Sequence, residues 1–144
     1  MIEPRHIAQV MGGRSVLGRV VSSMEDLEEI VGEGLPKTAL RIAVRRVFLV
    51  VREANRYLYR IVPEATYKRR TGKLRVMESE RTERLARVIA AAEAAWGDQS
   101  DAREWLTRPH PELGSRTPMD CALTELGARQ VESLVDRLQY GLPV

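Results

Sequence analysis

Lys68, Arg69 and Arg70 form the longest uninterrupted run of basic side chains in this sequence. The hydroxyl groups of Thr66 and Tyr67 precede them, so five neighbouring positions carry groups that bind phosphates and base edges. Such a run predicts binding to nucleic acid rather than the transformation of a substrate. The residues expected to contact DNA are Thr66, Tyr67, Lys68, Arg69, Arg70 and Lys73.

The charge of the chain is unevenly distributed around this run. Residues 36–75 contain twelve Lys or Arg against two Glu, a net charge of +10, whereas residues 1–35 carry −3 and residues 76–144 carry −4. A phosphate backbone is a common partner for such a basic block. The alternative is a solvated basic face, or a face that pairs with the acidic ends of the same chain.

The residues on which most enzyme chemistry depends are scarce. The chain has two histidines, His6 and His110, and a single cysteine, Cys121. A metal site needs three or four ligands at compatible spacing, which these distant residues do not supply. The sequence also has no glycine-rich phosphate loop after a strand and no nucleophile elbow. We therefore expect no catalysis and no cofactor, and a buried or half-buried Cys121.

Signals for export or membrane insertion are also missing from the sequence. No hydrophobic stretch follows a basic start, and no run of about 18 apolar residues occurs, so we expect neither a signal peptide nor a membrane span. A single cysteine excludes an internal disulfide and fits a reducing compartment. These observations predict a cytoplasmic protein.

Helices must position the basic run, because apolar residues recur at helical spacing along most of the chain. Ser23 is placed to cap a helix that Gly32 and Gly34 end. Further helices are expected over 37–48, 52–61, 63–71 and 80–96, and from Asp98 or Ser100 to Trp105. Residues 71–77 have the composition of a linker. The run 47–51 is also compatible with a short buried strand.

Helices 52–61 and 63–71 together predict a helix-turn-helix over about residues 52–71. Its second helix would be the recognition helix, which lies in the major groove in such motifs. Pro63 suits the first position of that helix, and Glu64 suits the positive end of its dipole. The fold class that follows from these elements is all-α.

The last third of the chain alternates helices with a proline-rich loop. The Thr117 hydroxyl and the Asp120 carboxylate are spaced for a reciprocal capping box. A glycine break is expected to follow, and then a helix with a single apolar stripe. The stripe consists of Val131, Leu134, Val135 and Leu138. Trp105 is large enough for a core or an interface, and we favour the core.

This last third resembles the toxin-binding domain of the Xre/MbcA/ParS antitoxins. Sixteen residues match in order and nearly in spacing, and three prolines and three glycines are among them. They are Arg103, Trp105, Leu106, Pro109, Pro111, Leu113, Gly114, Thr117, Pro118, Thr124, Glu125, Gly127, Ala128, Val131, Leu134 and Gly141. The resemblance implies an inhibitor of a RES-domain toxin that consumes NAD or transfers its ADP-ribose, and not an enzyme.

The middle of the chain resembles the other half of the same family more loosely. The segment Gly34-Leu35-Pro36 matches, and so does the pattern Thr-x-x-Arg-Arg at residues 66–70. Pro63 stands where the family usually has a capping hydroxyl, and the Ser-x-Glu-Glu cap before the long helix is replaced by residues 77–80. The resemblance implies a helix-turn-helix-like domain with operator DNA as a second partner.

Together these features predict three segments: an N-terminal arm at 1–22, a helix-turn-helix-like basic domain at 23–78, and the long helix with the toxin-binding domain at 79–144. We expect the carboxy-terminal tail and the loop near residues 111–116 to cover the toxin's NAD cleft. The residues expected to bind the toxin are Pro111, Glu112, Leu113, Arg116, Glu125, Arg129, Glu132, Asp136, Gln139, Tyr140, Leu142, Pro143 and Val144.

The expected assembly is a homodimer within a hetero-oligomer that represses its own operon. Two other functions remain open at this point. A stand-alone DNA-binding regulator without a toxin would share the basic segment, and an adaptor for some other enzyme would share the C-terminal surface. An adjacent gene for a RES-type protein would favour the antitoxin.

Overall fold

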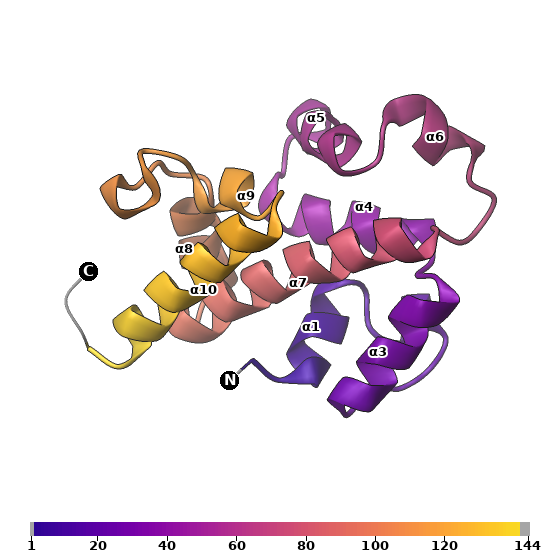
Figure 1. The fold of residues 1–144 in the computed structure, drawn as a ribbon, viewed down its shortest axis with the longest axis horizontal. Coiled ribbons are helices and arrows are strands. Elements are labelled where there is room, and N and C mark those ends of the chain that lie inside the picture. The colour runs from indigo at the N-terminus through magenta and orange to yellow at the C-terminus, as the bar shows by residue number, and fades with distance from the viewer. Residues whose placement is uncertain (1, 142–144) are drawn as a thin grey trace.

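The structure, a computed structural model, describes residues 2–141 (Figure 1). Ten α-helices and one 3-10 turn account for most of these residues, and no β-sheet forms among them. The all-α prediction is therefore confirmed. The helices are α1 (Pro4–Val10), α2 (Arg14–Leu17), α3 (Met24–Glu33), α4 (Lys37–Val47), α5 (Val51–Ile61), α6 (Glu64–Arg69), α7 (Val76–Trp96), α8 (Gln99–Leu106), α9 (Pro118–Cys121) and α10 (Glu125–Gln139), and the 3-10 turn is η1 (Pro111–Leu113).

The axis of the fold is α7, which runs through the middle of the molecule in Figure 1. Helices α1, α3, α4, α8 and α10 all pack against it. Residues 88–92 of α7 are all buried, and three of them are alanines, so neighbouring helices can approach its backbone closely. A helix that is apolar on several sides belongs in the interior, and this one links both halves of the chain.

The ends of α7 follow from local hydrogen bonds. It begins at Val76, four residues before the predicted start, because the Glu78 carboxylate accepts a hydrogen bond of 2.9 Å from the Arg75 N–H. It ends as predicted at Gly97, whose φ of 69° is the left-handed conformation common after a helix. Asp98, rather than Ser100, caps the following helix α8.

The ambiguous run at 47–51 is a turn and not a strand. Helix α4 ends at Val47 and α5 begins at Val51, as the helical interpretation predicted. The ring of Phe48 packs 5.2 Å from the ring of Tyr57, which anchors the turn from one side. Leu49, Val50 and Val51 are exposed, so burial does not explain the apolar character of these three positions.

The segment predicted to be an N-terminal arm contains a packed helix. Residues 4–10 form α1, which packs on α7 and buries Ile7, Val10 and Met11. These three residues have the i, i+3, i+4 spacing of an apolar helical stripe. Pro4 at the first turn supports the helix start. The domain boundaries after residues 22 and 78 remain predictions.

The stretch at 71–77, expected to be a linker, is held to the segment around Pro36 by hydrogen bonds. The Lys37 N–H donates to the carbonyl of Gly72, and the Leu74 N–H donates to the carbonyl of Leu35. The Leu35 N–H in turn donates to the Ser79 hydroxyl on α7. These hydrogen bonds fix the position of the connection between the basic helix α6 and α7.

A buried ion pair fastens α4 to α7. The Glu93 carboxylate, 7% exposed, accepts hydrogen bonds of 2.6 and 2.9 Å from the Arg46 guanidinium, and His6 Nε2 lies 2.9 Å from Glu93 Oε1. Burial alone raises the pKa of Glu93, but the hydrogen bonds from Arg46 and His6 outweigh it and hold that pKa below its usual value. One carboxylate thus connects three helices across the core.

We predict that Glu93→Gln lowers the free energy of unfolding by roughly 3 kcal/mol at pH 7, because it leaves the guanidinium of Arg46 without its counter-charge. This value is at the lower end of the loss expected when a buried ion pair is broken, because 21% of the Arg46 side chain remains exposed. A lowered pKa contributes stability that is present above the ordinary glutamate pKa, about 4.3, and lost as the pH falls below it. Urea unfolding at a series of pH values measures this.

The difference between wild type and Glu93→Gln should therefore shrink as the pH falls from about 5 to 3. A difference that stays constant over this range would show that the ion pair does not stabilise the fold through its charge.

The glycine in the last third does not break a helix. Gly127 lies in the first turn of α10, which begins at Glu125 after the capping hydroxyl of Thr124. A Cβ at Gly127 would lie 2.1 Å from the carbonyl oxygen of Cys121 and 2.8 Å from the Thr124 hydroxyl. The residue is glycine because the backbone of α9 passes against this turn.

Gly127→Ala should destabilise the protein by about 2–3 kcal/mol, because the atom in its way belongs to the backbone and cannot rotate aside. The matched control is Gly32→Ala in α3, where a Cβ would have no neighbour within 4 Å. There alanine should stabilise the helix by about 0.5–1 kcal/mol. Thermal unfolding of both variants tests the pair, and equal effects would contradict the close approach.

Candidate functional site

The loop between α8 and α9 has a fixed conformation. The His110 N–H donates to the carbonyl of Arg116, and the Ser115 N–H donates back to the carbonyl of His110. Between them lies η1, whose Leu113 is only 2% exposed and anchors the loop in the core. The Arg116 guanidinium donates to the Leu113 carbonyl and to the Gln130 side chain on α10. The loop is therefore ordered before any partner arrives.

Aromatic stacking supports the same loop from α8. The rings of Trp105 and His110 lie 5.0 Å apart, and His110 Nε2 lies 3.1 Å from the Trp105 carbonyl oxygen. Trp105 is half-buried and also contacts Trp96 at the end of α7, 6.5 Å between ring centres. Trp105 is thus a structural support for the loop, in agreement with the core placement.

The start of α9 confirms only half of the predicted capping box. The Thr117 hydroxyl accepts a hydrogen bond of 3.0 Å from the Asp120 N–H. The Asp120 carboxylate does not return to Thr117 but accepts a 2.9 Å hydrogen bond from Arg60 in the last turn of α5. The Tyr57 hydroxyl also donates to the Met119 carbonyl. These contacts join the basic half of the chain to the segment after the loop.

The thiol of Cys121 is buried at the junction of α9 and α10. Burial raises the pKa of this thiol above its ordinary value, which keeps it protonated at neutral pH. Cys121 is therefore a small core residue, as its sequence context predicted.

The structure separates the predicted toxin-binding residues into two groups on opposite sides of α10. Pro111, Glu112 and Arg116 are exposed on the loop, and Arg129 is exposed on the outer face of α10. This outer face forms a shallow cleft of about 550 Å³ with the loop. Leu113 lines its floor although most of its side chain is buried.

Leu126 is a member of this outer face that was not among the residues predicted to bind the toxin. Its side chain is 73% exposed and lines the same cleft as Glu112 and Arg129. Its position outside the stripe of Val131 and Leu134 is the sequence signal that could have identified it. An exposed leucine beside a rigid loop gives this face an apolar contact point.

The second group lies on the side of α10 that faces α7. The Glu132 carboxylate accepts from Arg87, which also pairs with Glu83 at 2.9 Å. Glu125 lies 3.6 Å from Arg84 and 3.7 Å from Arg87. Burial raises the pKa of Glu83, although Arg87 opposes that effect. These ion pairs hold α10 against the axis of the fold.

Farther along α10, a hollow of about 500 Å³ opens beside the paired side chain of Glu132. Asp136, Gln139 and Tyr140 line it, and Tyr140 is 73% exposed. Leu142, Pro143 and Val144, also predicted to bind the toxin, lie outside the described residues.

The predicted recognition helix α6 follows α5 after Val62 and Pro63. Lys68 and Arg69 are exposed on α6, Thr66 is half-buried, and Lys73 is exposed in the following connection. These four candidates are available to a nucleic acid.

Two other candidates on this segment have partners within the chain. Tyr67 is buried, and its hydroxyl donates to the carbonyl of Lys37 at 2.9 Å. The Arg70 guanidinium pairs with Glu78 at the start of α7, and this pair lowers the pKa of Glu78. The Lys37 ammonium donates to the carbonyls of Tyr67 and Arg70 at the end of α6. Tyr67 and Arg70 therefore orient α6.

Exposed Arg45 and half-buried Arg41 on α4 extend the basic surface, although they were not among the residues predicted to contact DNA. Burial raises the pKa of Tyr67, and the positive charges of Arg41 and Arg45 oppose that rise, so both lie close to α6. The alternation of basic and apolar positions in 37–48 is the signal that marks them.

Two further properties concern residues 2–141 as a whole. No group of three or more His, Cys, Asp or Glu side chains there is arranged to hold a metal ion. Within the same range, none of the helices is both long enough and apolar enough to cross a bilayer.

Comparison with known proteins agrees with this arrangement. Residues 91–141 match the sequence model described as the antitoxin Xre/MbcA/ParS C-terminal toxin-binding domain. The antitoxin Xre of Photorhabdus laumondii is 32% identical over 147 residues, which cover 96% of this chain and 95% of that protein.

Two shorter alignments point the same way. The antitoxin Xre of Pseudomonas putida is 36% identical over 84 residues, 56% of this chain and 53% of that protein. The antitoxin Xre of Yersinia enterocolitica is 40% identical over 78 residues, 52% of this chain and 53% of that protein. Each of these two matches spans about half of the relative's length. One of the three relatives matches over nearly the full length of both proteins, and the toxin-binding domain model covers the ordered loop and α10. The chain therefore belongs to the Xre/MbcA/ParS antitoxin family.

Proposed function

We propose that this chain neutralises a RES-domain toxin by covering the cleft in which that toxin binds NAD. The observation that favours this function most is the pre-ordered loop at 109–116, held by the His110 and Arg116 backbone pairing and by buried Leu113. A loop that is already rigid loses little conformational entropy when it binds, so more of its contact energy appears as affinity. Inhibition by occlusion requires shape and contact, and no chemistry from this chain.

Charge supports the same proposal. A cleft that holds the diphosphate of NAD should present cationic side chains, and residues 76–144 carry a net charge of −4. Glu112 and Asp136 are exposed acids on either side of α10 and are suited to such contacts. The tail from Gln139 onward would fill the mouth of the cleft while the loop shields its edge. Hydrolysis of NAD and transfer of ADP-ribose would both be blocked in this way.

Deletion of residues 139–144 should abolish toxin neutralisation and leave the fold intact. Gln139 and Tyr140 are exposed at the end of α10, so their loss removes little core packing. Growth of cells that express the toxin with the full or shortened chain measures neutralisation, and circular dichroism measures folding. A shortened chain that still protects the cells would contradict occlusion by the tail.

The matched control replaces residues 139–144 with a glycine and serine segment of equal length. This variant keeps the chain length and removes the side chains. It should fail to neutralise as the deletion does, if contacts rather than length matter.

A second function, repression of the chain's own operon, is favoured by the cations that α4 and α6 present at the surface, all exposed except half-buried Arg41. Lys68 and Arg69 lie on α6, and Arg41 and Arg45 lie beside it on α4. Hydrogen bonds between Lys37 and Tyr67 hold α6 against α4, and a recognition helix needs such a fixed orientation. A homodimer would present two such helices to half-sites about 34 Å apart. Residence in the cytoplasm, where operator DNA is accessible, belongs to the same proposal.

The double variant Lys68→Ala/Arg69→Ala should weaken binding to promoter DNA and leave toxin binding unchanged. For each phosphate that the variant no longer neutralises, the slope of log affinity against log salt should fall by about 0.9. Arg70 is kept in this test because its pair with Glu78 positions α6. Titration of labelled promoter DNA at several salt concentrations measures the slope.

Arg108→Ala is the control for this experiment, because Arg108 is 62% exposed beyond the end of α8 and away from α6. It should leave both affinity and slope unchanged. If the double variant binds the promoter as wild type does, α6 is not the DNA-binding element. If the chain binds promoter but no RES-type toxin, a stand-alone regulator is the better description.

A further inference from the structure

One face of α7 lines two neighbouring hollows. The residues on this face are Val76, Glu80, Glu83, Arg87, Ala91 and Ala94. They are spaced by three or four positions, which places them in one line on a helix. They line two adjoining hollows of about 500 and 350 Å³ that share Met24 and Arg87. The 18 helical steps from residue 76 to residue 94 correspond to about 27 Å, or roughly five helical turns.

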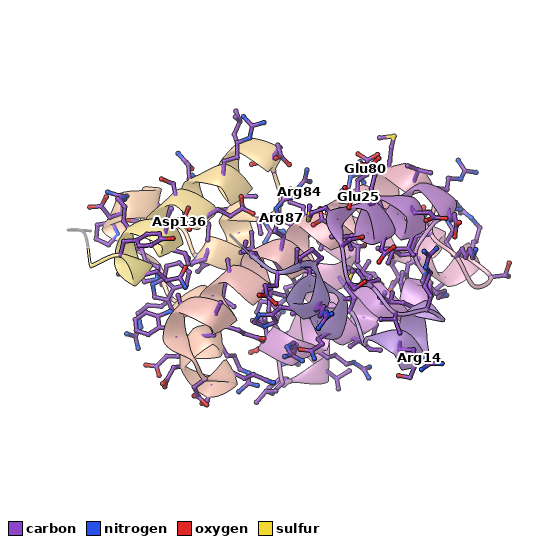
Figure 2. All side chains as sticks on the ribbon, turned by 90° about the horizontal axis from the view of Figure 1, so that it is seen from below. Arg14, Glu25, Glu80, Arg84, Arg87 and Asp136 are labelled. Atoms are coloured by element: carbon purple, nitrogen blue, oxygen red, sulfur yellow. The ribbon has the colours of Figure 1, made fainter. Side chains whose placement is uncertain are left out.

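The walls of this long groove come from elements distant in sequence. Met24, Leu27 and Val31 of α3 border the end near Val76. Ile2, Ile7 and the end of α10 border the other end, together with Tyr140. Figure 2 looks toward this side of the molecule and shows Asp136 and Glu80 on either side of Arg84 and Arg87. The groove therefore joins the N-terminal helices to the toxin-binding domain.

The lining of the groove combines apolar and acidic groups. Met24 is 51% exposed and Val76 is 44% exposed, which leaves apolar surface in solvent. Five acids border the hollows against a single cation, Arg87, and they are Glu28, Glu80, Glu83, Glu132 and Asp136. Arg87 is already engaged by the carboxylates of Glu83 and Glu132.

Several of these acids have no partner within the described chain. Glu28, Glu80 and Asp136 form no ion pair with any residue of 2–141, and Glu83 Oε2 is buried there without a hydrogen bond. An apolar groove with unpaired acids along its edge is complementary to an apolar stripe flanked by cations. Nucleic acid is the wrong partner for this face, because its phosphates carry the same charge sign.

We propose that this groove binds a basic amphipathic helix of the partner toxin, with Leu-type side chains on the floor and Lys or Arg beside Glu28, Glu80 and Asp136. This inference rests on the proposed function, which makes the partner a toxin. A second copy of this chain fits less well. Packed two-fold on this groove, it would bring the same acids, Glu28, Glu80 and Asp136, against each other.

The test uses the double charge reversal Glu28→Lys/Glu80→Lys, which lies outside the residues assigned to occlusion. Its matched control is Glu53→Lys/Glu104→Lys, two exposed acids elsewhere on the surface. The probes are the toxin encoded beside this chain and a 20-residue amphipathic peptide of Leu and Lys. Titration calorimetry with each probe should show affinity weakened roughly tenfold or more by the groove variant and changed less than about twofold by the control.

The outcomes separate this inference from the function on which it rests. If the toxin binds unaltered and groove-reversed chains equally, the groove assignment is wrong and occlusion by the tail stands. If the toxin does not bind the unaltered chain, both the groove assignment and the proposed function are wrong. If sedimentation shows that the reversal changes only self-association, the groove holds a second copy and the assignment is wrong. Thermal unfolding of both variants should match wild type, because all four substituted residues are exposed: Glu28, Glu80, Glu53 and Glu104.

Discussion

Close packing around α7 is the constraint on which the rest of the structure depends. Most of the helices contact α7, and the buried alanines at its centre let their backbones approach. Because protein interiors tolerate few voids, a larger residue in this row would push several helices apart at once. The Glu93 carboxylate fixes the orientation of two of these helices, because it is hydrogen-bonded to Arg46 of α4 and to His6 of α1. The position of both proposed binding surfaces therefore depends on this one helix.

Two kinds of surface result from this arrangement. One is cationic, built on α4 and α6, and the other is acidic and partly apolar, built on α3, α7 and α10. The separation of charge that the sequence shows along the chain is thus also a separation in space. Arg60 with Asp120, and Tyr57 with Met119, connect the two regions between α5 and α9. The two proposed partners, a toxin and operator DNA, would therefore bind at different faces of the protein.

Much of the fold could be predicted from the sequence, because helical spacing and caps are local signals. Ser23, Thr117 and Thr124 accept the hydrogen bonds that start their helices, and Gly97 ends α7. The features that the sequence does not show depend on contacts between distant residues. Pro4–Val10 is a weak helix signal in isolation and becomes a helix because α7 covers Ile7 and Val10. Contact of Tyr67 and Arg70 with DNA stays a prediction, but their partners within the chain, Lys37 and Glu78, do not show in the local sequence pattern. Leu126 and the α7 groove needed the arrangement of α10 against the loop and the axis.

The buried thiol of Cys121 has a practical consequence. With its side chain buried and its pKa raised, the native protein should be indifferent to air oxidation during purification. A maleimide or another alkylating dye can reach that sulfur only when the packing around the end of α9 opens. The rate of labelling then reports how often this part of the protein opens, and no engineered tag is required.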